Sequence, residues 1–135
     1  MAHRTAMIDV GGGFRAIFGA GVMDRMLEDG IMVDHCYGVS AGSANMVSYI
    51  SKQHGRTHKF YTEYAFRKEY ASLDSYIKNH NYANLDYMYS TLSNHDGEYP
   101  VDYEAFAANP TGFTVVACNA EDGSTKYFDK SDVSY

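Results

Sequence analysis

Two glycine-rich turns, each directly after a short apolar run, constrain the fold of this chain more than any other feature. The glycine run at 11–13 follows residues 6–10. The Gly-Val-Ser-Ala-Gly stretch at 38–42 begins within the apolar run at 36–39 and continues past its end. Short apolar runs that end at glycine are typical of buried strands. A stretch with helical spacing of apolar residues follows each turn. This order predicts a βαβ unit whose two parallel strands end at the same edge of a sheet.

The rest of the chain predicts further helices and one hairpin. The first helix is expected over residues 17–29, and its inner face would carry Phe18, Val22, Met23, Met26 and Leu27. The second is expected over residues 41–53, and its inner face would carry Ala44, Val47 and Ile50. Residues 57–70 predict another helix. The tyrosine-rich stretch 72–98 predicts short helical turns and loops, either packed into the core or covering a site. A helix start is expected at 100–106 and a hairpin from strands 113–118 and 126–128.

These elements predict a three-layer α/β/α fold with a mainly parallel sheet and helices on both faces. Four strands make a small sheet, and nothing after the hairpin resembles a closing helix. We therefore expect residues 1–135 to be the N-terminal part of a domain whose C-terminal part is absent. Strand edges and apolar helix faces left uncovered would then favour a homo-oligomer.

Composition narrows the classes of partner. The net charge of −6 argues against nucleic-acid binding, which needs clustered lysine and arginine, although Lys52, Arg56, His58 and Lys59 leave room for a local basic patch. No signal peptide or membrane-spanning run is visible, which favours a cytoplasmic location. The two cysteines lie in apolar runs and are expected to be buried free thiols.

Ser40 is the candidate catalytic residue. It is the central residue of a G-x-S-x-G pattern, with Gly38 and Gly42 on either side, between a predicted strand and a predicted helix. This context fits a nucleophile elbow, in which small neighbours let the chain turn sharply and expose the serine hydroxyl. The alternative is a tight turn in which Ser40 only caps the helix.

The glycine run is the candidate oxyanion-binding loop. It should lie beside Ser40, and backbone N–H groups of Gly12, Gly13 and Ala41 could donate to a developing oxyanion. Arg15 could order this loop or favour an anionic head group.

The same loop allows a second interpretation. Gly11, Gly13 and Ala16 formally match the dinucleotide-binding pattern G-x-G-x-x-G/A. A nucleotide-binding domain would need a carboxylate at the end of the second strand to hold a ribose. That strand instead ends in Gly38, Val39 and Ser40, which disfavours nucleotide binding.

The two turns together resemble the patatin-like phospholipase family. That family has a Gly-Gly-Gly-x-Arg/Lys-Gly loop after its first strand and a G-x-S-x-G elbow one βα unit later. The loop is matched by Gly11, Gly12, Gly13 and Arg15, and the elbow by Gly38, Ser40 and Gly42. The resemblance covers nearly the whole chain and is strongest over residues 6–56. It implies a serine acyl hydrolase that cleaves carboxylic esters of lipids without a metal or organic cofactor.

The resemblance also implies a Ser-Asp dyad, and the aspartate is the main departure. In the family it belongs to an Asp-Gly motif far beyond the elbow. Asp122 precedes a glycine, but in a predicted hairpin turn where glycine has an ordinary conformational role, and Asp96 lies in a polar loop. We therefore expect the dyad aspartate beyond Tyr135, and this chain alone to be inactive or nearly so. Val10 and Ala16 are smaller departures that affect only the detailed geometry of the loop.

Three alternatives stay open. One is a histidine base, although His54, His58, His80 and His95 do not follow a late strand as in classical α/β hydrolases. The second is the nucleotide-binding domain, and the third is a non-catalytic patatin-like scaffold. The expected partner is a lipid or other acyl ester, with room for transient contact with a membrane surface.

Overall fold

The fold is built on a four-stranded sheet in the order β1-β2-β3-β4. The computed structural model describes residues 4–73, 76–77 and 80–132. Three strands are parallel and the last is antiparallel to its neighbour; they are β1 (Ala6–Asp9), β2 (His35–Val39), β3 (Gly112–Cys118) and β4 (Thr125–Asp129). The α/β class, the parallel βαβ order and the hairpin predicted from the sequence are confirmed. A short 3₁₀ turn, Lys130–Asp132, follows β4.

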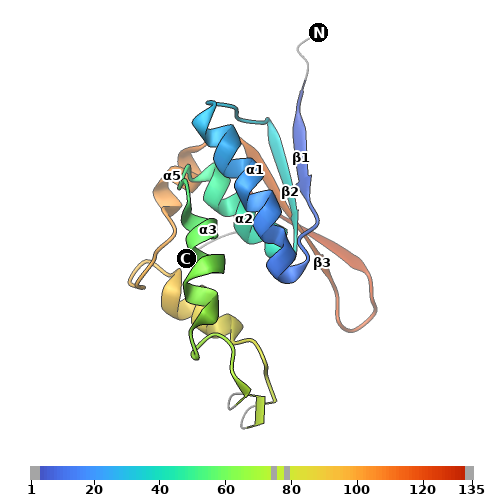
Figure 1. Cartoon of the computed structure of the whole chain (residues 1–135). Coiled ribbons are helices and arrows are strands. Elements are labelled where there is room, and N and C mark those ends of the chain that lie inside the picture. The colour runs from blue at the N-terminus through green and yellow to red at the C-terminus, as the bar shows by residue number, and fades with distance from the viewer. Residues whose placement is uncertain (1–3, 74–75, 78–79, 133–135) are drawn as a thin grey trace.

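The helices begin close to where the sequence places them. They are α1 (Ile17–Glu28), α2 (Ala41–Ile50), α3 (Arg56–Thr62) and α5 (Tyr103–Ala108). Figure 1 shows that β1 and β2 end at the same edge of the sheet, where α1 and α2 start. The helix predicted over 57–70 is too long, because the backbone leaves the helical region at Glu63 (φ −124°) and continues as a 3₁₀ turn, Tyr64–Phe66.

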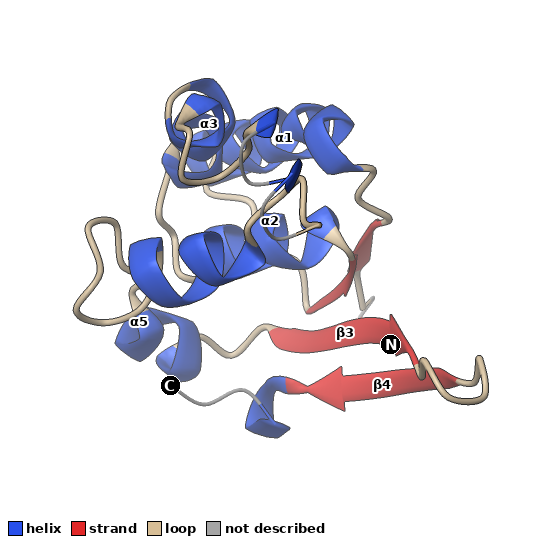
Figure 2. Cartoon of the chain, turned by 90° about the horizontal axis from the view of Figure 1, so that it is seen from below, coloured by secondary structure: helices blue, strands red, loops and turns tan. Residues whose placement is uncertain are grey.

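Helices α1, α2 and α3 lie on one face of the sheet (Figure 2). On the other face, Ile8 of β1 and Tyr127 of β4 are both 68% exposed. A second helical layer on that face stays a prediction. No helix formed by the described residues has the length and apolar character needed to cross a bilayer.

The core lies between the sheet and α2. Its buried members include Cys36 from β2, Phe113 from β3 and Tyr49 from α2, with Met23 from α1. The predicted inner face of α1 is partly wrong, because Phe18 is 80% exposed and Val22 is 43% exposed. Small residues are buried instead, Ala20 in the helix and Ala16 directly before it, so α1 can approach its neighbours closely.

The two cysteines have different environments. Both are free thiols. Cys36 is fully buried, and burial raises the pKa of its thiol to about 12. Cys118 is exposed at the end of β3, so the expectation of two buried thiols is wrong for Cys118. The last residues of β3, Ala117 and Cys118, extend past the part of the strand that pairs with β2.

The tyrosine-rich segment after α3 folds back over the helices. It contains a π-helical stretch, η3 (Tyr87–Leu92), and is tied to the turn after α3 by Arg67, which donates to both carboxylate oxygens of Glu98 over 2.6 and 2.8 Å. The guanidinium also stacks on the Tyr64 ring at 4.4 Å. The segment both packs into the core, through Tyr87 and Leu92, and covers a cavity described below.

Candidate active site

Ser40 lies on a strained turn between β2 and α2. Its backbone has φ 53° and ψ −132°, a combination that costs an L-residue about 1–3 kcal/mol and that persists only where the surroundings enforce it. The two motif glycines enforce it through close approaches. A Cβ on Gly38 would lie 2.5 Å from the Ser43 Cα, and a Cβ on Gly42 would lie 2.2 Å from the Asp9 carbonyl oxygen. The Ser40 side chain is exposed rather than packed into the core.

The glycine loop packs directly against this turn. A Cβ on Gly11 would lie 2.5 Å from the Val39 oxygen and 3.0 Å from the Ala41 nitrogen. Gly11, Gly12 and Gly13 all have positive φ, so a side chain at any of them would be strained, and at Gly11 it would be obstructed as well. The loop leads into a 3₁₀ turn, Gly13–Ala16, and then into α1.

Arg15 interacts with the loop itself. Its backbone N–H and its Nε both donate to the Gly12 carbonyl oxygen, over 3.3 and 3.4 Å. The side chain is otherwise exposed. Of the two roles considered for Arg15, ordering the loop is therefore the one for which the structure gives a contact.

Asp9 and Asn45 connect the glycine loop to α2, and the sequence analysis did not identify either residue. One Asp9 carboxylate oxygen accepts the Gly11 N–H over 2.9 Å, and the other accepts from Asn45 Nδ2 over 2.8 Å. Asn45 Nδ2 also donates to the Ala16 carbonyl oxygen over 2.9 Å. Gly19 leaves room for the carboxylate, because a Cβ there would lie 2.6 Å from Asp9 Oδ2. The sequence signal that could have identified Asp9 is a carboxylate at the end of an apolar strand.

We expect Asp9→Asn to destabilise the protein by about 1–3 kcal/mol. The amide group introduced by this substitution would face the Asn45 Nδ2 donor, which the Asp9 carboxylate accepts in the parent. Urea unfolding measures this change. The exposed Asp86→Asn is the matched control and should stay within about 0.5 kcal/mol of the parent. Equal stability of the two variants would mean that the Asp9 carboxylate does not hold the loop.

A cavity of about 600 Å³ opens beside Ser40. It lies between α2, α3, η3 and β3, and Gly13, Ser40 and Ala41 form part of its wall. Apolar side chains dominate the rest of the wall, including Phe14, Ala44, Val47, Leu92, Phe113 and Val115. The predicted inner-face residues Ala44 and Val47 of α2 thus face this cavity. Its size and lining suit an apolar ligand.

Tyr61 lines the cavity near the glycine loop, with its ring centroid 6.1 Å from that of Phe14. Burial, reinforced by the negative charge of Asp9, raises the pKa of Tyr61 to about 12. Burial also raises the pKa of Tyr70 and Tyr89, which line the same cavity. These hydroxyls stay neutral at physiological pH, so none of the three can serve there as an ionised base.

No carboxylate or imidazole among the described residues hydrogen-bonds to the Ser40 hydroxyl. Asp122 is exposed in the hairpin turn, where its Oδ1 accepts the Ser124 N–H over 2.8 Å. Hydrogen bonding by Ser124 lowers the pKa of Asp122. Neither Asp122 nor Asp96 lines the cavity beside Ser40.

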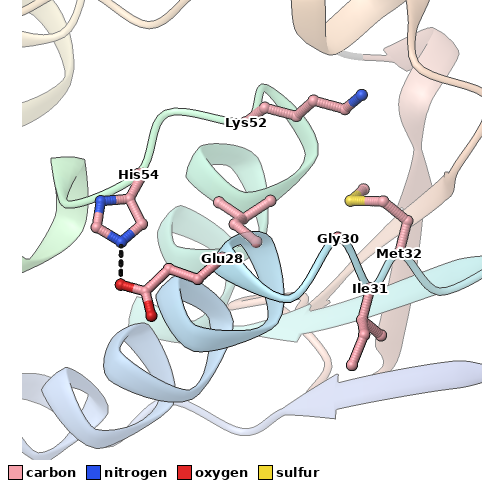
Figure 3. Close-up of a pocket in the computed structure, with 7 residues that line it drawn as sticks. Glu28, Gly30, Ile31, Met32, Lys52 and His54 are labelled. Atoms are coloured by element: carbon pink, nitrogen blue, oxygen red, sulfur yellow. Dashed lines mark hydrogen bonds and ion pairs between the residues drawn. The ribbon is translucent and has the colours of Figure 1, made fainter.

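His54 lies at the wrong end of α2 to act on Ser40. Its Nε2 is 3.0 Å from Glu28 Oε1, in a shallow pocket formed by the ends of α1 and α2 (Figure 3). Ser40 precedes the N-terminus of α2, whereas His54 follows its C-terminus. The imidazole and carboxylate of this pair therefore do not form a triad with Ser40.

Comparisons with known proteins agree with these features. The family model described as patatin-like phospholipase matches residues 10–132. YjjU of Escherichia coli (strain K12), an uncharacterised protein, is 27% identical over 129 residues, which is 93% of this chain and 35% of YjjU. This chain therefore spans about a third of the length of that relative. No solved structure gives a significant match.

Proposed function

The chain belongs to the patatin-like phospholipase family, and on that premise we propose that Ser40 is the nucleophile of a lipid acyl hydrolase. The observation that carries the proposal is the strained backbone of Ser40 on the wall of an apolar cavity. A serine that only capped a helix would need neither the strain nor the cavity. The family supports hydrolysis of lipid esters as the class of reaction.

The first chemical step is attack by Ser40 on the ester carbonyl carbon. A base takes the hydroxyl proton as Oγ forms the new bond, and the carbonyl oxygen becomes an oxyanion. The N–H groups of Gly12, Gly13 and Ala41 are proposed to donate to it. Ala41 is the first residue of α2, and Gly13 is the first residue of a 3₁₀ turn. Backbone N–H groups at these positions have no acceptor within their own helix and can donate to a bound group.

The oxyanion then collapses and expels the alcohol, which takes the proton from the base. The acyl group stays on Ser40 as an ester until water, deprotonated by the same base, attacks the acyl carbon. The bond from that carbon to Oγ then breaks, Oγ takes the proton back from the base, and the acid is released. The cavity would hold the acyl chain through both steps. Neither a metal nor an organic cofactor is required by this scheme.

We assign the base to an aspartate outside these residues, completing the Ser-Asp dyad of the family. Two facts support this assignment: the Ser40 hydroxyl has no carboxylate partner among the described residues, and the matched region covers only 35% of YjjU. Residues 1–135 would then supply the nucleophile, the oxyanion donors and the acyl cavity of a larger hydrolase domain. Alone they should turn over esters slowly or not at all.

Labelling with a fluorophosphonate, located by mass spectrometry on the complete protein, tests the nucleophile. We expect the adduct on Ser40 and its loss in Ser40→Ala. Ser43→Ala is the matched control, since Ser43 lies one helical turn away on the same cavity wall and should leave labelling intact. An adduct that persists in Ser40→Ala would refute the assignment.

A further inference from the structure

One part of the wall of the cavity beside Ser40 carries three tyrosine hydroxyls. Tyr61 comes from α3, Tyr70 from the turns that follow it, and Tyr89 from η3. Helix α2 and strand β3 contribute a different surface. Among the described residues of the wall, their side chains are apolar apart from Ser40 and Ser43. The cavity therefore has an apolar side and a side that carries hydroxyl groups.

The Tyr61 hydroxyl has no hydrogen-bond partner among the described residues, although Tyr61 is only 7% exposed. Buried hydroxyls are normally paired, because a missing hydrogen bond is costly in a low-dielectric interior. Among the described residues, the polar side-chain atoms that are both unpaired and sealed from solvent belong to Ser43, Asn45, Thr57 and Ser124. Tyr61 is not one of these residues, so its hydroxyl oxygen keeps accessible surface where the side chain lines the cavity. A bound molecule can therefore reach it.

Tyr70 and Tyr89 add two more hydroxyls that have no hydrogen-bond partner in the described part of the chain. Phe60 packs edge-on against both Tyr61 and Tyr70, with ring centroids 5.6 and 5.4 Å apart. Burial mainly raises the pKa of Tyr61, and interaction with Tyr70 and Tyr89 raises it further. The three hydroxyls therefore lie near one another. Each is neutral and can both donate and accept a hydrogen bond.

The charges around the cavity favour a neutral ligand over a phosphate. Binding of a phosphate usually relies on arginine or lysine. Arg56 is the only residue of either kind on the described wall, and its Nη1 lies 3.4 Å from the Ser48 hydroxyl, about two turns of α2 beyond the elbow. Arg15 does not line the wall and donates to the glycine loop instead. The Asp9 carboxylate, whose charge also raises the pKa of Tyr61, would repel a second anion nearby.

We propose that the tyrosine hydroxyls bind the alcohol part of the ester, and that this alcohol is a neutral polyol such as glycerol, without a phosphate. The inference rests on the proposed function, because it places the ester at Ser40 and the acyl chain along the apolar side. Hydroxyl groups of a polyol donate and accept as tyrosine hydroxyls do, so the two can pair. A simple alkyl alcohol would displace water and leave Tyr61 unpaired. A phosphate would bring negative charge towards Asp9.

Calorimetric titration of the Ser40→Ala form of the complete protein tests this site without turnover. The ligands are three esters with the same acyl chain: monooctanoylglycerol, propyl octanoate and monooctanoylglycerol phosphate. We expect the glycerol ester to bind more tightly than the phosphate, and about tenfold more tightly than the propyl ester, the effect of one additional net hydrogen bond. In Tyr61→Phe, which keeps the ring, the preference over the propyl ester should disappear. The thermal midpoint of that variant should be unchanged or higher, because the lost hydroxyl had no partner in the described fold.

Tyr64→Phe is the matched control. It removes the same hydroxyl from a similarly buried tyrosine in the 3₁₀ turn after α3, but Tyr64 does not line the cavity. The preference for the glycerol ester should persist there. Equal affinities for the glycerol and propyl esters, tightest binding of the phosphate, failure of all three to bind, or a preference that survives Tyr61→Phe would each overturn the proposal. A Ser40 that fails to react with fluorophosphonate would count against the nucleophile alone and leave this binding result intact.

Discussion

Gly42→Ala is expected to destabilise the protein by about 3 kcal/mol or more, at the upper end of what overpacking costs. The new Cβ would lie 2.2 Å from the carbonyl oxygen of Asp9 and 2.7 Å from its carbonyl carbon. These are backbone atoms of β1, which is paired with β2 and cannot yield as a flexible side chain can. The Asp9 carboxylate, which holds the glycine loop, would be displaced as well. Such a loss is a large share of the stability of a typical domain.

Gly21→Ala is the matched control for this prediction. Gly21 lies inside α1, is exposed, and has no atom within 4 Å of the place where a Cβ would be. Alanine there should stabilise the helix by about 0.5–1 kcal/mol. Urea unfolding followed by circular dichroism measures both variants. A Gly42→Ala protein as stable as its parent would show that α2 does not approach β1 as closely as the structure has it.

Ser40→Gly is expected to abolish fluorophosphonate labelling and to stabilise the fold by about 1 kcal/mol. Glycine adopts a positive φ without the strain of an L-residue, which outweighs the greater freedom it gives the unfolded chain. The Ser40 side chain is exposed, so little packing is lost with it. Ester hydrolysis by the complete protein should fall by about 10³-fold or more, because the proposed nucleophile is removed. Opposite changes in activity and stability are characteristic of strain kept for function.

Lys52→Gly separates the strain from the chemistry. Lys52 also has a positive φ, 56°, but it lies after α2 and outside the cavity. We expect a similar gain in thermal midpoint with full labelling of Ser40. If Ser40→Gly lowers the thermal midpoint while Lys52→Gly raises it, the elbow is not strained as the backbone angles indicate.

The strands and the starts of the helices could be predicted because they depend on neighbouring residues. Apolar runs that end at glycine predicted β1 and β2, and the Asp-Gly turn predicted the β3–β4 hairpin. The burial of α1 was less predictable. Phe18 and Val22 were expected inside, but close packing of the first turns buries the small residue Ala20, together with Ala16 just before the helix. Side-chain size at a helix contact depends on the partner surface, which the spacing of apolar residues does not describe.

The sequence by itself determined that two glycine-rich turns end neighbouring parallel strands, so Ser40 and the glycine loop had to lie together. Only the tertiary structure decided what holds and extends that site. Asn45 donates a hydrogen bond to Asp9, and Arg56 donates one to Ser93. Both hydrogen bonds join residues that are distant in the chain. Such contacts depend on how α2, α3 and η3 pack on the sheet. Local patterns specify the elements, whereas the pairing of buried polar groups is specified only once those elements are packed.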